Sequence, residues 1–210
     1  MKLQKNIFIV LAFVALYFGV AWFFPWELAQ LDSTVSIAYL WDVLFAVLIG
    51  IAYQLPLKKP TWPKHFKGAL ARCLVILLLA LTSIMFLKMA SIATPFRYLE
   101  RPILQLLILA PLLEELVFRH AFLGALLRAL NSETKALLIS SFLFSVSHLP
   151  GIWHLPEEFR PFIVIQLVYA FAMGWVIGKA RTRTGAVWEP IFLHFLFNLC
   201  FYFAVLRGWV

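Results

Sequence analysis

Two adjacent glutamates and a nearby arginine interrupt an apolar stretch of this sequence. Glu114, Glu115 and Arg119 lie within residues 103–127, which are predominantly apolar. An ionised side chain at the centre of a membrane helix costs about 2.5 to 3.5 kcal/mol on insertion scales, so these three residues require partners or a function. Glu115 and Arg119 are four residues apart and share one helical face, which favours an ion pair between them. Glu114 lies about 100° round the helix and is therefore free to face another group.

Two later apolar stretches add polar side chains at the same helical spacing. Phe144 is followed by His148, and His194 is followed by Asn198, so the members of each pair are one turn apart on one helical face. With a rise of about 1.5 Å per residue, Glu114, His148 and Asn198 lie roughly 16 to 21 Å from the presumed inner ends of their helices. A single histidine or asparagine in a membrane helix more often joins two helices by a hydrogen bond. The carboxylate, the imidazoles and the amide can meet at a similar depth in the membrane. This combination favours a catalytic site.

The composition places these groups in a membrane protein. Of 210 residues, 63% are apolar and only 13% are charged, against about 45–50% and about 25% in soluble domains. This excludes a disordered chain and an ordinary cytosolic fold. Cys73 and Cys200 both lie in apolar runs, which excludes a disulfide framework and a CxxC metal site. The net charge is +8, but the basic residues are dispersed between apolar runs, so we expect no nucleic-acid partner.

The elements that must position the polar groups are seven apolar runs of about the length that spans a bilayer. They are residues 7–24, 35–55, 68–89, 103–127, 136–149, 161–178 and 187–206. The predicted fold class is therefore all-α, a polytopic membrane helix bundle of about seven transmembrane helices. We expect a single transmembrane domain over residues 1–210, with accessory spans in 1–102 and a catalytic core in 103–206. Asp42, alone in the second run, has no assigned partner; a helix contact and a peripheral role both stay open.

The distribution of basic residues predicts how the chain lies in the membrane. With seven spans, twelve Lys and Arg residues fall on the side of the N-terminus and five on the opposite side, while Arg119 is inside the membrane. Loops rich in Lys and Arg remain in the cytoplasm, so we expect a cytoplasmic N-terminus. The first run follows Lys2 and Lys5 but lacks a small-x-small cleavage site, so we interpret it as a retained span rather than a signal peptide.

The three polar patterns together resemble a known family of membrane enzymes. Glu114 to Arg119 fits EExxxR, Phe144 to His148 fits FxxxH, and His194 to Asn198 fits HxxxN, in this order along the chain. The ordered trio resembles the CPBP family, the CAAX protease and bacteriocin-processing group of intramembrane endopeptidases that includes the prenyl-CAAX endopeptidase. The resemblance covers residues 114–198.

The resemblance implies a role for each motif residue. Glu114 would activate a water molecule for attack on a peptide carbonyl, with assistance from His148. His194 and Asn198 would hold that water or the developing oxyanion. Glu115 and Arg119 would orient the helix, and Phe144 would have a structural role. One departure from the family pattern is His120, where many relatives carry glycine after the motif arginine.

The same resemblance implies a membrane-associated protein or peptide as the substrate, met in the lipid bilayer. Prenylated C-termini, bacteriocin leaders, sorting tails and membrane-bound regulators are all substrates of the family, and the sequence does not choose among them. We expect no cofactor.

Two alternatives stay open at this stage. Glu114, His148 and His194 would supply three ligands of a zinc site with water in the fourth position, although no HExxH pattern occurs. A non-enzymatic membrane protein, such as a proton-coupled transporter or a scaffold, would also use buried carboxylates and histidines. No inverted repeat, a common feature of transporters, is evident in the sequence.

Overall fold

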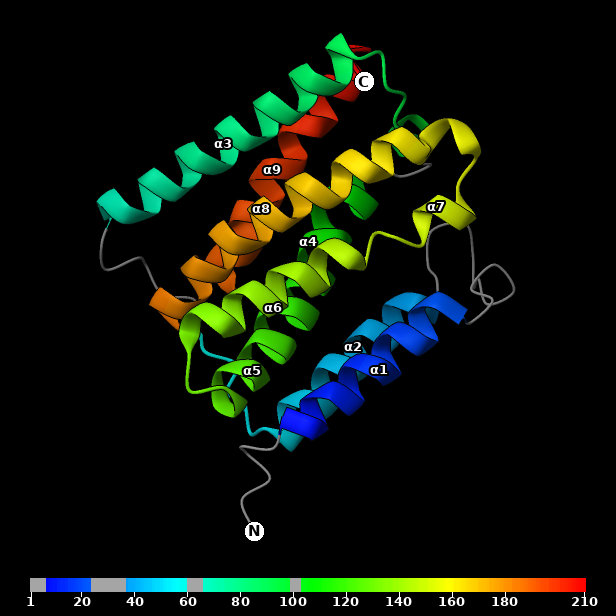
Figure 1. Cartoon of the computed structure of the whole chain (residues 1–210). Helices are drawn as coiled ribbons and strands as arrows, with labels where there is room; N and C mark the ends of the chain where they lie inside the picture. The colour runs from blue at the N-terminus through cyan, green and yellow to red at the C-terminus, as the bar shows by residue number, and fades with distance from the viewer. Residues whose placement is uncertain (1–6, 24–36, 60–65, 99–102) are drawn as a thin grey trace.

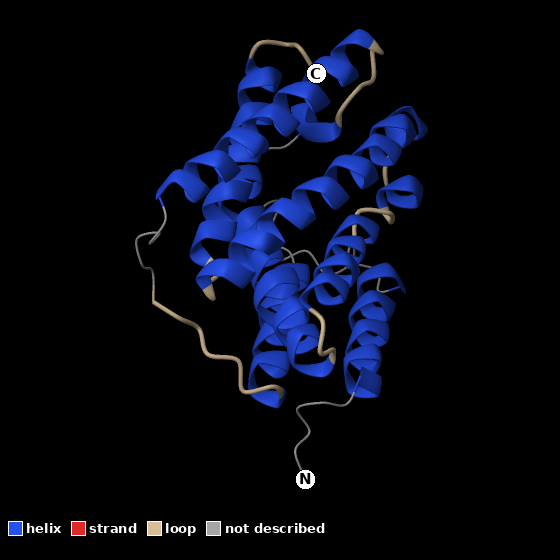
Figure 2. Cartoon of the chain, turned by 60° about the vertical axis from the view of Figure 1, so that its left-hand side comes forward, coloured by secondary structure: helices blue, strands red, loops and turns tan. Residues whose placement is uncertain are grey.

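The computed structural model of the chain describes residues 7–23, 37–59, 66–98 and 103–210. All regular elements in these ranges are helices (Figure 1), and the view coloured by secondary structure has no strand among them (Figure 2). The predicted all-α fold is therefore confirmed. Residues 24, 35 and 36 of the predicted runs lie outside the described residues, and so do four basic residues used for the orientation: Lys2, Lys5, Lys64 and Arg101.

Each of the seven predicted apolar runs is helical over most of its described length. Six correspond to one helix each: α1 (Ile7–Phe23), α2 (Ile37–Ala52), α3 (Phe66–Met89), α6 (Glu133–Val146), α8 (Arg160–Thr184) and α9 (Trp188–Leu206). The run 103–127 becomes four consecutive segments, η4 (Ile103–Leu109), α4 (Ala110–Glu115), η5 (Leu116–Phe122) and α5 (Leu123–Ala129). Short elements η3 (Pro95–Tyr98), α7 (Gly151–His154) and η6 (Glu157–Phe159) lie in connections. A helix satisfies its own backbone polar groups, which lipid does not do, and this explains the all-helical outcome.

Four helical stretches of the described chain are long and apolar enough to cross a membrane by length and composition. They are Phe66–Met89, Glu133–His154, Glu157–Thr184 and Trp188–Leu206. Two shorter apolar helices, Ile7–Phe23 and Tyr39–Ala52, accompany them. Large apolar side chains are exposed on the outer faces of α1, α2 and α3, where lipid is their natural solvent. These features are those of an integral membrane protein.

The segmented stretch 103–129 lies in the interior of the bundle. α2, α6 and α9 pack around it, α3 packs against α8 and α9 on one side, and α1 and α2 lie side by side on the other (Figure 1). Asp42 of α2 accepts a hydrogen bond of 2.9 Å from the hydroxyl of Tyr17 in α1. Asp42 therefore joins two helices. Of the two roles left open for it, the structure shows the helix contact.

Glycines let α8 approach α6 closely. Gly174 and Gly178 are four residues apart and buried in the contact between these helices. A Cβ on Gly174 would lie 3.2 Å from the Cα of Ser141, and one on Gly178 would lie 2.7 Å from a methyl group of Leu137. Small residues at this spacing allow the backbones of two membrane helices to pack tightly. The pair thus brings α8 against α6, and with it one wall of the candidate site.

Polar contacts join several helix ends at one end of the bundle. Lys179 near the end of α8 lies 3.1 Å from Glu133 at the start of α6. Arg72 near the start of α3 lies 2.6 Å from Glu189 at the start of α9, and this pair is largely buried. Arg128 at the end of α5 donates hydrogen bonds to carbonyl groups just beyond α2. The chain therefore returns to the same end of the bundle after alternate helices, as the seven-run pattern requires.

Candidate active site

The central helix departs from α-helical register one turn before the glutamate pair. η4 is π-helical, and in that register the carbonyl of residue i accepts from the N–H of residue i+5. Five residues after Leu106 stands Pro111, which has no N–H to donate. Asn198 supplies the missing donor, since its side-chain amide bonds the Leu106 carbonyl at 2.8 Å. Asn198 thereby attaches α9 to the segment that carries the glutamates.

A second π-helical segment, η5, follows the glutamates. Ser140 of α6 donates a hydrogen bond of 2.9 Å to the carbonyl of Phe118 in this segment. Both π-helical segments thus have a carbonyl that accepts from a side chain of a neighbouring helix. π-helical turns within α-helices recur at functional sites. Here they flank the turn that presents Glu114 and Glu115 to α9.

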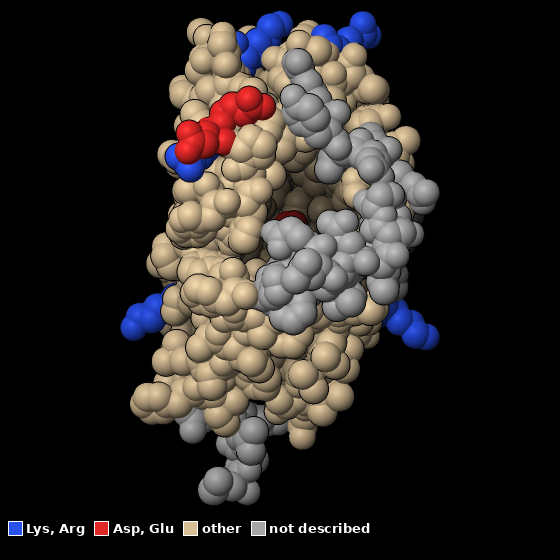
Figure 3. Space-filling model, turned by 90° about the vertical axis from the view of Figure 1, so that its right-hand side faces the viewer, with Lys and Arg blue, Asp and Glu red and all other residues tan. Residues whose placement is uncertain are grey.

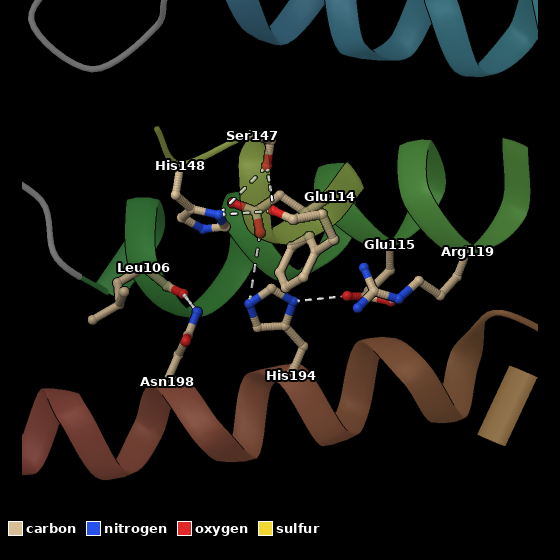
Figure 4. A network of polar contacts seen from close by, with 9 residues as sticks. Leu106, Glu114, Glu115, Arg119, Ser147, His148, His194 and Asn198 are labelled. Carbon is tan, nitrogen blue, oxygen red and sulfur yellow. Dashed lines mark hydrogen bonds and ion pairs between the residues drawn. The ribbon is translucent and has the colours of Figure 1, made fainter. Parts of the chain in front are cut away.

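Glu115 is the centre of a buried polar network. One carboxylate oxygen lies 3.2 Å from Arg119 Nε, and the other lies 2.9 Å from His194 Nδ1 (Figure 4). Glu115, Arg119 and His194 are exposed by only 0%, 1% and 3%. The ion pair between Glu115 and Arg119 expected from their spacing is therefore present. The contact with His194 was not anticipated, because it joins residues 79 positions apart.

Phe144 provides a surface for the buried arginine. The Arg119 guanidinium carbon lies 4.1 Å from the centre of the Phe144 ring, in a cation–π arrangement. Neither terminal nitrogen of Arg119 has a hydrogen-bond partner among the described residues. In a desolvated setting a cation–π contact stabilises by about 2 kcal/mol or more. This contact explains, in physical terms, why a phenylalanine precedes the histidine in the FxxxH pattern.

His194 connects the two glutamates. A carboxylate only accepts, so the bond from Nδ1 to Glu115 assigns the proton to Nδ1. The other ring nitrogen, Nε2, then points to Glu114, whose nearest carboxylate oxygen is 3.8 Å away (Figure 4). This distance is too long for a direct hydrogen bond and suits a bridging water. The Glu114 side chain is 29% exposed, in contrast to the fully buried Glu115.

His148 lies at the end of α6 with its ring orientation set by the backbone. Its Nδ1 is 3.0 Å from the carbonyl oxygen of Phe144, one turn earlier, and 3.4 Å from the hydroxyl of Ser147. A carbonyl oxygen only accepts, so Nδ1 carries the proton and Nε2 is left available. The ring also packs edge-on against Phe144, with centroids 5.1 Å apart. The Phe144 carbonyl and ring thus hold His148 in one orientation.

A cavity of about 150 Å³ brings these groups together. The sequence-predicted residues Glu114, His148, His194 and Asn198 all line it. The remaining lining side chains come from η3, η4, α4, α8 and α9: Phe96, Leu106, Ala110, Gln166, Tyr169, Ala170, Met173, Phe197 and Phe201. Figure 3 shows a hollow on one side of the molecule with an acidic side chain deep inside it. The cavity offers a carboxylate, two imidazoles and an amide to a small polar group, in largely apolar surroundings.

Two polar residues of the cavity, Gln166 and Tyr169, were not singled out from the sequence. Both belong to α8, which lacks a motif of the family, and they are three residues apart on one face. The signal available in the sequence was weak: an amide and a phenol at helical spacing within the uncharged run 161–178. Only the packing of α8 against α6 and α9 turns that face to the cavity.

The donor set does not fit a metal site in the described part of the chain. There, no three side chains of His, Cys, Asp or Glu are close enough together to hold a metal ion. The suggested zinc ligands Glu114, His148 and His194 do not form such a group, although both histidines keep Nε2 free. We therefore derive no step through zinc.

Comparison with known proteins identifies relatives of the C-terminal half. The profile of the family described as "Type II CAAX prenyl endopeptidase Rce1-like" matches residues 101–200, the region that contains all three motifs. The "Putative membrane peptidase YdiL" of Bacillus subtilis (strain 168) is 36% identical over 91 residues, which make up 43% of this chain and 32% of that protein. The similarity thus spans about a third of the length of this relative. No solved structure matches the chain significantly.

Proposed function

We propose that this chain, which belongs through residues 101–200 to the CAAX protease family, is an intramembrane endopeptidase that acts on a membrane-associated protein or peptide. The observation that carries the proposal is the chain of contacts from Arg119 through Glu115 and His194 to Glu114 at the wall of the cavity. The buried Glu115 carboxylate orients an imidazole toward a second carboxylate, Glu114, that is accessible from the cavity. This is the arrangement expected of a general base with a fixed neighbour.

In the proposed reaction, Glu114 removes a proton from a water molecule. We place this water between Glu114 and His194 Nε2, where the 3.8 Å separation leaves room for a bridge. The water oxygen attacks the carbonyl carbon of the scissile peptide bond, and the proton moves to Glu114. The carbonyl oxygen becomes an oxyanion. When the carbon–nitrogen bond breaks, Glu114 returns the proton to the leaving amine, so a carboxyl and an amine product are released.

Asn198 would stabilise the negative charge that develops on the carbonyl oxygen, and the two histidines would orient the attacking water. Fixed donors in a site shielded from water stabilise a transition state strongly, by about 2.7 to 4 kcal/mol for a single oxyanion donor in a well-studied protease. One N–H of the Asn198 amide holds the Leu106 carbonyl, which leaves the second N–H for the cavity. His148 has its Nε2 available at the same cavity. We assign the free Asn198 N–H to the oxyanion, and the Nε2 atoms of His148 and His194 to the water, from which they accept hydrogen bonds.

The substitution Glu114→Gln tests the assignment of the base. Glutamine has nearly the same shape but does not take the proton, so we expect cleavage to fall by at least a thousandfold while the protein accumulates normally. The purified protein would be reconstituted in liposomes with a panel of peptides, among them a prenylated CAAX peptide, a bacteriocin-leader peptide and a transmembrane peptide. Products would be identified by mass spectrometry.

A matched variant controls for the loss of one negative charge. Glu158→Gln makes the same change at an exposed position in η6 and should cleave as the unaltered protein does. Cleavage by Glu114→Gln at the rate of this control would refute the base assignment. Failure of the unaltered protein to cleave any member of the panel would count against the protease itself.

Chelation tests the proposal that the reaction needs no metal. Proteoliposomes dialysed against 1,10-phenanthroline and EDTA should retain their full rate, because the site uses a carboxylate rather than a metal-bound water as its base. Metal content would be measured in parallel by atomic emission. A loss of activity that stoichiometric zinc restores would show that the metal-independent mechanism is wrong.

A further inference from the structure

α8 forms a wall of the cavity that carries no family motif. Gln166, Tyr169, Ala170 and Met173 line the cavity and occupy one face of this helix. Two of the four are polar. A glutamine or tyrosine within a membrane span normally bonds to a neighbouring helix, because lipid offers no partner.

Neither polar side chain has such a partner among the residues that the structure describes. Tyr169 is 93% buried, with 7% of its surface exposed, and its ring packs against Phe197 and Phe201 at centroid distances of 5.4 and 5.6 Å. No described residue makes a hydrogen bond with the Tyr169 hydroxyl or with the Gln166 amide. A buried tyrosine hydroxyl usually finds a partner. These groups therefore have unused hydrogen-bonding capacity next to the proposed base.

The Gln166 amide and the Tyr169 hydroxyl can form the same hydrogen bonds as a peptide backbone. The Gln166 amide both donates and accepts, and the Tyr169 hydroxyl does the same. A substrate segment must lose its helical hydrogen bonds before its carbonyl is open to attack, and its exposed N–H and C=O groups then need new partners inside the membrane. The side chains that line the rest of this wall, Ala170 and Met173, offer only apolar contact.

We propose that Gln166 and Tyr169 bind the main chain of the substrate next to the scissile bond. The inference rests on the proposed function. It adds that the enzyme recognises an unwound segment of its substrate through hydrogen bonds to the peptide backbone. Gln166 pairs with one N–H and one C=O of the segment, and Tyr169 donates to a neighbouring carbonyl. The two residues position the substrate, while Glu114 and the histidines act on it.

Steady-state kinetics on a peptide that the unaltered protein cleaves in liposomes tests the proposal. Gln166→Met and Tyr169→Phe keep the size of each side chain and remove its hydrogen bonds. We expect KM to rise about tenfold, which corresponds to a loss of about 1.4 kcal/mol of binding free energy. The value of kcat should change less than threefold. Tyr202→Phe makes the same change in α9 away from the cavity and should leave both constants unaltered.

A backbone-modified substrate separates direct binding from an effect on folding. Peptides that carry a single N-methyl group at successive positions around the cleavage site should include one whose KM is about tenfold higher with the unaltered protein. The same peptide should show no further rise with Gln166→Met, because the bond is already absent.

The outcomes distinguish this inference from the proposed function. If Glu114→Gln is inactive but KM is unchanged in Gln166→Met and Tyr169→Phe, the backbone contact is refuted and the protease stands. The same holds if the N-methyl effect adds fully to that of Gln166→Met. If the unaltered protein cleaves nothing, both proposals fall.

Discussion

Neighbouring glutamates have different environments in this protein. Glu115 is fully buried and contacts Arg119 and His194, whereas Glu114 is partly exposed at the cavity and lies 3.8 Å from the same histidine. A rotation of about 100° per residue separates the two side chains on the helix, and one imidazole lies within reach of both. The paired carboxylate sets the ring orientation, and the accessible one is left for chemistry. Two residues of the same type thus have different roles because their environments differ.

Glu115→Gln should therefore destabilise the protein more than Glu114→Gln does. The change leaves the Arg119 guanidinium buried without a compensating charge, and breaking a buried pair in this way costs about 3 to 5 kcal/mol. We expect a markedly lower accumulation in membranes and earlier aggregation on heating in detergent, followed by fluorescence-detected size-exclusion chromatography. Equal thermal stability of the two variants would contradict the structural role of Glu115.

At the scale of elements, the site depends on changes of helical register and on one close helix contact. Pro111 and the π-helical segment η4 leave the Leu106 carbonyl to Asn198, which links the glutamate segment to α9. Gly174 brings α8 within contact of Ser141 and of the Arg119 guanidinium. The distance of α8 from the glutamates is thus determined by a residue without a side chain.

Gly174→Ala should destabilise the bundle. The added Cβ would lie 3.2 Å from the Cα and the Cβ of Ser141 and 3.3 Å from an Arg119 nitrogen. The Ser141 backbone can make room for this atom only if α6 shifts. Such overpacking lowers the free energy of unfolding by about 1 to 3 kcal/mol. Gly19→Ala is the matched control, since nothing lies within 4 Å of its added Cβ and alanine favours a helix. Thermal stability in detergent that is equal for the two variants would show that the α6–α8 contact tolerates a methyl group.

At the scale of the whole molecule, the helix ends divide between two sides. The end of α5, the start of α6, the end of α8 and the starts of α3 and α9 are joined by polar contacts at one end of the bundle. Many of the basic residues of the described chain, including Arg128, Lys135 and Lys179, belong to this end. The rule that basic loops remain in the cytoplasm places this end inside the cell, which is our proposal for the orientation.

Labelling of single cysteines tests the orientation. With Cys73 and Cys200 replaced by alanine, Asn131→Cys marks the basic end and Glu158→Cys the opposite one; both positions are exposed. In intact cells a membrane-impermeant maleimide should label only Glu158→Cys, and Asn131→Cys should react after permeabilisation. The reverse pattern would show that the N-terminus faces outward.

The helical fold and the candidate residues follow from the amino-acid sequence alone. Seven apolar runs predicted the helices, because length and hydrophobicity suffice to specify a helix in lipid. The spacing of three or four residues placed Glu115 with Arg119, because the helical rotation per residue is a property of the backbone. The ordered motifs also indicated the resemblance to the CAAX proteases, and the family profile matches residues 101–200, which contain them.

How these groups meet depends on the packing of the helices, which the sequence did not reveal. The contact of His194 with both glutamates, the placement of Phe144 beneath Arg119 and the inclusion of α8 in the cavity all join separate helices. Such contacts depend on the rotation and depth of each helix, which non-local packing sets and which local periodicity does not contain. The π-helical segments also shift the register within the run that carries the glutamates, and a regular α-helical pattern does not predict such a shift.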